Sequence, residues 1–133
     1  MLYCLFVQDG WTQLFRDSDA GWHIRNGERI VSSGALAKGD PFSFTRAGAA
    51  WYSWEWAADV AMGLAHRAGG LAGVAVLYAM LIGVATYLWF QLQWQAGSDF
   101  LLALVAAIPM IAATSLHWLA RPHVFGWVLL LLG

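Results

Sequence analysis

Residues 70–90 read GLAGVAVLYAMLIGVATYLWF, a run of 21 residues without a charge. At about 1.5 Å of rise per residue, a helix of this length crosses a hydrocarbon core of about 30 Å. Aromatic side chains gather at its end, where amphipathic rings favour the headgroup region: Tyr87, Trp89, Phe90 and Trp94. The run therefore predicts a transmembrane helix.

The composition of the chain also favours a membrane protein. Charged residues make up 11% and apolar residues 60% of the sequence, whereas about 25% of an ordinary soluble domain is charged. The charge is segregated, because Asp99 is the only charged residue between Ala68 and Ala120 and six of the seven basic residues lie in the first 67 positions. With a net charge of −1 we expect no nucleic-acid partner.

A second apolar run extends over 21 residues from Phe100 to Ala120, with Pro109 near its centre. Proline in a membrane helix is typical of a packing bend, because neighbouring helices satisfy the freed carbonyl. The short polar link between the two runs predicts an antiparallel hairpin. Gly69 and Gly73 form a small-residue pair at the start of the first run, which indicates close helix packing.

Both ends of the chain look like incomplete spans. The final run VFGWVLLLLG, residues 124–133, is about half as long as a span requires. At the other end, residues 1–7 read as the tail of a first span, because they lack the basic region and cleavage site of a signal peptide. Cys4 is the sole cysteine, so no internal disulfide can form. We expect a fragment that is inactive alone.

The region from Gln8 to Arg67 is a polar block of 60 residues, too long for a simple turn. Asp17 or Ser18 can cap a short helix that runs to about Ser32 and ends at Gly34. Three polar side chains then fall on one face of that helix: Asp19, His23 and Asn26.

A second amphipathic helix is predicted over residues 53–67. Glu55, Asp59 and His66 share one stripe of this helix. The opposing apolar face consists of Trp56, Val60, Ala61 and Leu64. This pattern is typical of a helix lying flat on a membrane surface.

The predicted fold is an all-α integral membrane protein with two full transmembrane helices, partial spans at each end and a long polar loop carrying amphipathic surface helices. We divide it into a lead-in over residues 1–16, the loop over 17–67, and a hairpin with the start of a further span over 68–133. The unfinished final segment is expected to need either another membrane subunit as a partner or further sequence.

The polar block also resembles the start of a bacterial group of multi-span proteins related to GT-C glycosyltransferases. Its stretch DSDAGWHIRNGERIVSSGALAKGDPFSFTRAGAAWYSWEW follows the group's pattern of Asp-x-Asp, Trp-His, Asp-x-Phe-Ser-x-Thr and Glu-Trp. The matching residues are Asp17, Asp19, Trp22, His23, Gly27, Ile30, Gly34, Asp40, Phe42, Ser43, Thr45, Gly48, Trp51, Glu55 and Trp56. Arg121-Pro122 before a new span is similar too, whereas Ala37 stands where a proline is common.

This resemblance implies transfer of a sugar from a polyprenyl phosphate to an acceptor hydroxyl, at an extracytoplasmic loop of a bacterial inner-membrane protein. The acceptor hydroxyl must lose a proton, and a positioned carboxylate can take it. Asp19 is the first candidate for this base and Asp17 the second, and the two could hold a divalent metal. Membrane lipid and the polyprenyl-phosphate sugar are the implied partners.

Four further side chains are candidates for substrate binding: His23, Glu55, Arg121 and His123. Arg121 and His123 would supply positive charge for the leaving phosphate. The alternative, that Arg121 anchors the chain at the membrane interface and binds no substrate, stays open.

Two observations leave alternatives open. The basic residues of the polar block would place it in the cytoplasm by the positive-inside rule, whereas the resemblance implies the outer side. Nine tryptophans and four histidines would also suit an accessory subunit of a pigment or redox complex, with His66, His117 or His123 binding a cofactor.

Overall fold

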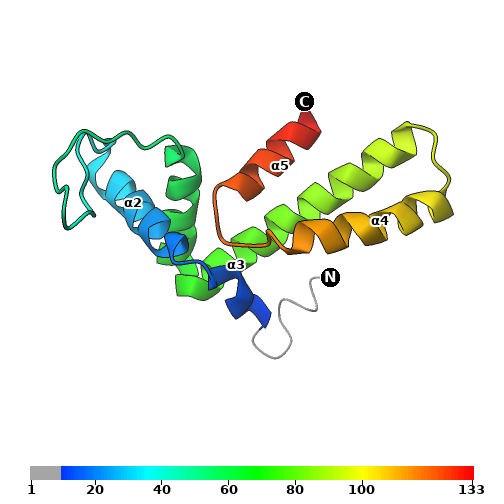
Figure 1. Ribbon diagram of the computed structural model, residues 1–133, viewed down its shortest axis with the longest axis horizontal. Coiled ribbons are helices and arrows are strands. Elements are labelled where there is room, and N and C mark those ends of the chain that lie inside the picture. The colour runs from blue at the N-terminus through cyan, green and yellow to red at the C-terminus, as the bar shows by residue number, and fades with distance from the viewer. Residues whose placement is uncertain (1–9) are drawn as a thin grey trace. The chain divides into compact units, whose positions relative to one another are not determined.

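The computed structural model describes residues 10–133, and its regular elements there are all helical, with no named strand. The elements, drawn in Figure 1, are a 3₁₀ helix η1 (Gly10–Phe15) and the α-helices α2 (Asp19–Ser33), α3 (Trp56–Gln95), α4 (Phe100–Ser115) and α5 (His123–Leu132). The predicted all-helical fold is confirmed. The predicted remnant of a first span at residues 1–7, with Cys4, lies outside the described residues.

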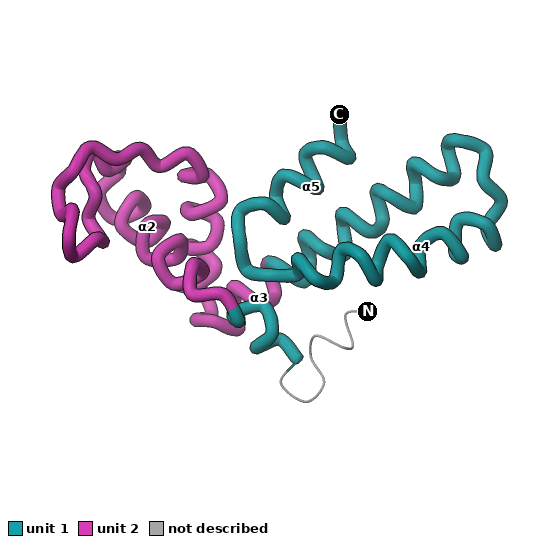
Figure 2. The backbone as a smooth tube through the Cα atoms, in the orientation of Figure 1, with its two compact units in different colours: residues 1–16, 78–133 teal, residues 17–77 magenta. Residues whose placement is uncertain are grey.

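The chain forms two compact units, shown in different colours in Figure 2. One unit comprises residues 17–77, and the other contains residues 78–133 with the segment up to Arg16. The polar block and the apolar run thus belong largely to different units, joined through α3.

Helix α2 is confirmed close to its predicted limits of 18–32. At its start, the Asp17 carboxylate accepts the backbone N–H of Asp19 at 3.0 Å, which satisfies one of the unpaired donors of a helix N-terminus. At its end, Gly34 takes a left-handed conformation with φ 66° and donates its N–H to the Ile30 carbonyl. A glycine adopts this conformation without steric cost, so the helix ends where predicted.

Helices α2 and α3 cross at two glycines. A Cβ atom added to Gly27 would overlap the carbonyl of Asp59, and one added to Gly63 would lie 2.5 Å from the backbone nitrogen of Glu28. The two backbones are therefore in direct contact, and only glycine fits at either position.

Helix α3 breaks at Gly69 and Gly70, where Gly70 adopts φ 60° and ψ −150°, a combination open almost only to glycine. The break separates the predicted surface helix from the predicted span. A Cβ on Gly73 would overlap the carbonyl of Ala65, so the chain on either side of the break packs closely at Gly73. The expected close packing at Gly73 is confirmed, whereas Gly69 forms part of the break.

The first part of α3 turns its polar stripe toward α2. Asp59 is fully buried, while Trp56 and Leu64 on the opposite side are 47% and 50% exposed. The amphipathic helix predicted at residues 53–67 thus begins at Trp56, and its polar stripe is partly enclosed by α2. Its apolar face lies outward, as expected of a helix whose apolar face meets lipid.

In the other unit, the second part of α3 and α4 form the predicted antiparallel hairpin (Figure 1). Gly97 turns the chain with φ 88°, and Asp99 caps α4 by accepting the N–H of Leu102 at 2.8 Å. The rings of Phe90 and Phe100 lie edge to face across the turn, with centroids 6.1 Å apart.

Helix α4 has 16 residues, which at about 1.5 Å each gives about 24 Å, less than the core of about 30 Å. The expectation of a helix through Ala120 is wrong for its last five residues. Beyond Ser115 the backbone leaves the helix, and the N–H of Ala120 donates to the carbonyl of Leu14 at 2.7 Å instead of to the preceding turn.

The final run forms α5, which has 10 residues. Val124 at its start is fully buried, and Phe125 lies edge to face with Tyr78 of α3, with centroids 6.0 Å apart. Among the described residues one helix, α3, is long and apolar enough to cross a membrane. A second full span is not seen, because α4 and α5 are both shorter apolar helices.

Candidate functional site

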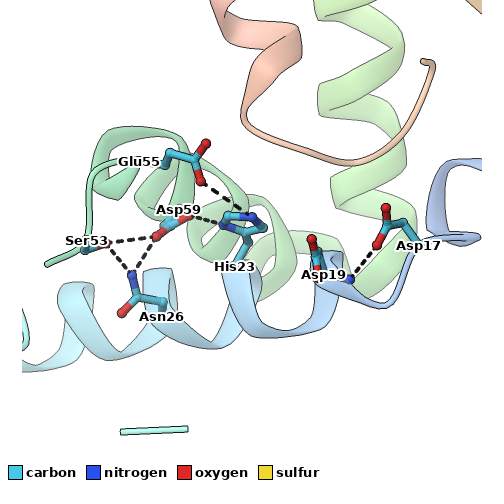
Figure 3. Close-up of polar contacts among 7 residues, drawn as sticks. All are labelled: Asp17, Asp19, His23, Asn26, Ser53, Glu55 and Asp59. Carbon is cyan, nitrogen blue, oxygen red and sulfur yellow. Dashed lines mark hydrogen bonds and ion pairs between the residues drawn. The ribbon is translucent and has the colours of Figure 1, made fainter. Parts of the chain in front are cut away.

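The polar faces of α2 and α3 meet around the buried carboxylate of Asp59, as Figure 3 shows. The His23 Nδ1 lies 2.6 Å from Asp59 Oδ1. Asp59 Oδ2 accepts from the Asn26 amide at 2.5 Å and from the Ser53 hydroxyl at 3.2 Å. Both oxygens of this buried carboxylate are therefore satisfied, as burial of a charge requires.

The His23 ring links Asp59 to Glu55. Its Nε2 lies 3.8 Å from Glu55 Oε2, and the Glu55 side chain is 51% exposed. An ionised carboxylate can only accept, so Asp59 fixes the proton on His23 Nδ1 and directs Nε2 toward Glu55. The His23 ring thus lies between two carboxylates, hydrogen-bonded to the buried Asp59 and 3.8 Å from the half-exposed Glu55.

Asn26 contributes one unused acceptor to this cluster. Its amide nitrogen donates to Ser53 and Asp59, whereas its Oδ1 is buried and has no hydrogen-bond partner among the described residues. The amide orientation follows from the two acceptors that face its nitrogen.

Asp17 and Asp19 lie at the start of α2, one turn before His23 (Figure 3). Both are partly buried, and the helix N-terminus favours negative charge at this position. Asp17 uses Oδ1 to cap the helix, as the sequence indicated. Within residues 10–133 no group of three or more potential ligands is arranged to hold a metal, so a metal on this pair would need ligands from elsewhere.

A second polar contact joins the two helices at Glu28. Glu28 Oε1 lies 2.6 Å from His66 Nδ1, and Oε2 accepts from Arg25 at 2.9 Å. Arg67 donates to the Glu28 carbonyl and to Ser32 Oγ. The hydrogen bond from His66, helped by Arg25, holds the pKa of Glu28 below its ordinary value of 4.5.

The other candidates belong to the other unit. Arg121 and His123 lie at the beginning of α5, and His123 Nε2 is 2.9 Å from the carbonyl oxygen of His117. The structure thus brings together His23 and Glu55 among the predicted site residues, and places Arg121 and His123 in a separate unit.

The sequence analysis missed two residues of this site: Asp59, the partner of His23, and Ser53, which bonds to Asp59 and Asn26. The signal was present, because His23 and Asn26 share a face of α2 and Glu55, Asp59 and His66 share a stripe of α3. The sequence did not show that these two faces pair with each other. Gly27 and Gly63 mark the point where the two helices cross.

Compared with family models, with curated proteins and with solved structures, the chain has no match.

Proposed function

We propose that this chain is part of a membrane glycosyltransferase related to the GT-C enzymes, which transfers a sugar from a polyprenyl phosphate to an acceptor hydroxyl. One observation carries the proposal. The resembling block falls within a single compact unit, where the N-terminal ends of α2 and α3 present Asp17, Asp19, His23 and Glu55 near the buried Asp59 carboxylate.

Asp19 is the proposed base for the acceptor hydroxyl. It is partly accessible at the start of α2, while the neighbouring Asp17 carboxylate holds its backbone N–H. Proton transfer to a positioned carboxylate typically accelerates a reaction by about 10²–10⁴-fold. Asp17 is the second candidate, and a metal shared by the two carboxylates is a further possibility for the same site.

Glu55 is the proposed contact to the acceptor, and the buried His23 ring beside it is proposed to position it. The exposure of Glu55 supports this role, because a binding group must reach substrate. The buried Asp59 supports it as well, since it fixes the His23 ring that faces Glu55. Arg121 and His123 stay candidates for binding the phosphate, on the chemistry of their side chains.

A lipid-borne donor suits the outer surface of this unit. Trp56 and Leu64 on the outward face of α3 are half-exposed, and the nearby Tyr52 and Trp54 are largely exposed. Aromatic and apolar side chains of this kind favour the membrane interface. We propose that the unit lies on the periplasmic side of a bacterial inner membrane, with α3 beyond Gly70 and residues 100–120 as two crossings.

The experiment is a donor-release assay on the protein that carries this sequence, reconstituted in liposomes with polyprenyl-phosphate-linked hexoses and pentoses. We expect release of polyprenyl phosphate that depends on added acceptor, and none from nucleotide sugars. Absence of release with every lipid-linked donor would contradict the proposal. Visible absorption by the purified protein would instead favour the pigment or redox subunit.

A further inference from the structure

A shallow pocket lies in the loop region between α2 and α3, next to the Asp59 cluster, because its lining residue Trp22 stacks on His23 with ring centroids 3.6 Å apart. Its lining consists of Trp22, Asp40, Phe42, Ser43 and Trp51, and its volume is about 260 Å³. Trp22 belongs to α2 and the other four belong to the connecting loop. The loop is held in place by an isolated antiparallel bridge between Gly39 and Ala50.

The three aromatic rings stand at steep angles to one another. The Trp22 centroid lies 6.4 Å from that of Phe42 and 6.1 Å from that of Trp51, with interplanar angles of 53° and 74°. The Phe42 and Trp51 rings are perpendicular, with centroids 6.2 Å apart. Because the three separations are nearly equal, a point over their middle lies within about 6 Å of every centroid, the range of a cation–π interaction.

Asp40 gives this pocket a negative charge. Its Oδ1 accepts the backbone N–H groups of Phe42 and Ser43 at 2.8 and 2.9 Å. The Ser43 hydroxyl, followed by these two N–H groups, holds the pKa of Asp40 below its ordinary value. The carboxylate is therefore ionised at neutral pH, and no lysine, arginine or histidine is among the lining residues.

We propose that this pocket binds a methylated organic ammonium ion of the choline type. Three aromatic rings and one carboxylate supply the quadrupole and the counter-charge that such a cation requires. Its methyl groups need no hydrogen-bond acceptors, which suits a lining with only two polar side chains. A sugar would present several hydroxyls to the same two groups, and a primary ammonium would present three donors.

This proposal is independent of the glycosyltransferase proposal, because it uses neither Asp19 nor Glu55. Choline could reach the pocket as a free solute or as the headgroup of phosphatidylcholine. The two sources share the chemistry of the bound group and differ in whether the membrane delivers it.

The test is a titration of the whole protein, in a nonionic detergent without choline groups, with choline and with its neutral isostere 3,3-dimethyl-1-butanol. Binding is followed by calorimetry and by broadening of the ligand methyl resonance. We expect choline to bind and the neutral isostere to bind at least several-fold more weakly. Methyl glucoside serves as the sugar probe.

Two variants locate the binding site. Asp40→Asn retains acceptors for the loop N–H groups but removes the charge, and Trp51→Ala removes one ring. Each should lower choline affinity by about 2- to 30-fold, the range that cation–π energies correspond to. Trp54→Ala is the matched control, because Trp54 is 83% exposed and does not line the pocket. Helix content by circular dichroism checks folding, and Asp40→Asn carries the test if Trp51→Ala unfolds.

Each outcome of these measurements either supports or overturns the proposal. Selective choline binding that both folded pocket variants weaken would support the proposal. A lower apparent choline affinity in phosphatidylcholine nanodiscs than in phosphatidylglycerol nanodiscs would identify the lipid headgroup as the source, and equal affinities the free solute. Absence of choline binding, equal binding of the neutral isostere, preference for methyl glucoside, or binding unchanged in Asp40→Asn would overturn it.

Discussion

Asp59 is the residue on which the packing of α2 against α3 depends most. It is fully buried and bonds to His23 and Asn26 of α2 and to Ser53 of the loop before α3. A carboxylate in this position stabilises the fold only while its partners remain, because each of them is also buried. The cluster therefore fixes how the two helices are paired.

Replacing Asp59 by alanine should lower the free energy of unfolding by about 3–5 kcal/mol, the usual cost of removing one partner from a buried polar pair. The reason is that the buried His23 ring and one N–H of the Asn26 amide would lose their partner, while the other N–H of Asn26 keeps Ser53. The measurement is a denaturant titration in mild detergent, followed by circular dichroism.

Glu55→Gln is the matched control for Asp59→Ala. Glu55 is near the same histidine ring but half exposed, so the change should stay within about 0.5 kcal/mol. Equal losses in the two variants would mean that Asp59 has no special structural role.

Glu28 should make stability depend on pH. Its folded pKa lies below the ordinary 4.5, chiefly through the His66 hydrogen bond. The stabilisation is therefore complete above about pH 4.5 and is lost as pH falls through the lower folded pKa. Unfolding titrations between pH 6 and pH 3 should show the wild-type advantage over Glu28→Gln shrinking as the pH falls, and an advantage that is constant or grows would contradict this account.

At the level of residues, the sequence predicts types of interaction better than partners. The caps at Asp17 and Gly34 were predicted because capping is local. The His23–Asp59 and Glu28–His66 pairs join residues 36 and 38 positions apart, and their formation depends on how two helices dock. Spacing along one helix carries no information about that docking.

At the level of elements, glycine decides both the crossing of α2 with α3 and the break within α3. Gly27 and Gly63 allow backbone contact between the helices, and Gly70 takes a conformation that other residues avoid. The predicted boundary between the surface helix and the apolar run follows from this break. The end of α4 was not predictable from hydropathy, because a bond from Ala120 to Leu14 competes with the helix.

Gly27→Ala should destabilise the unit of residues 17–77 by about 1–3 kcal/mol, as overpacking of a tight contact does. The added methyl group would overlap the backbone carbonyl of Asp59. A backbone group in a helix cannot move aside as a flexible side chain can. The same unfolding titration measures the loss.

Gly21→Ala is the control on the same helix. No atom lies within 4 Å of its added Cβ, so the change should be neutral or stabilise by about 0.5–1 kcal/mol through helix propensity. Destabilisation by both substitutions to a similar degree would argue against backbone contact at Gly27.

At the level of the whole molecule, the sequence predicted the helical class and the separation of a polar block from an apolar region. It overestimated the second span, since only α3 is long and apolar enough to cross a membrane among the described residues. Composition indicates how much of the chain is apolar, whereas the length of each helix also depends on tertiary contacts such as the bond from Ala120 to Leu14. The proposed function rests on the polar unit rather than on the number of spans.

The most direct test of that function is sugar transfer by the protein that carries this sequence with Asp19→Asn. We predict a loss of about 10²–10⁴-fold in the transfer rate, with expression and membrane insertion unchanged. Asp99→Asn is the control, since an asparagine can still accept the Leu102 N–H that Asp99 accepts at the start of α4, and it should transfer sugar at the wild-type rate. Wild-type transfer by Asp19→Asn would contradict the assignment of Asp19 as the base.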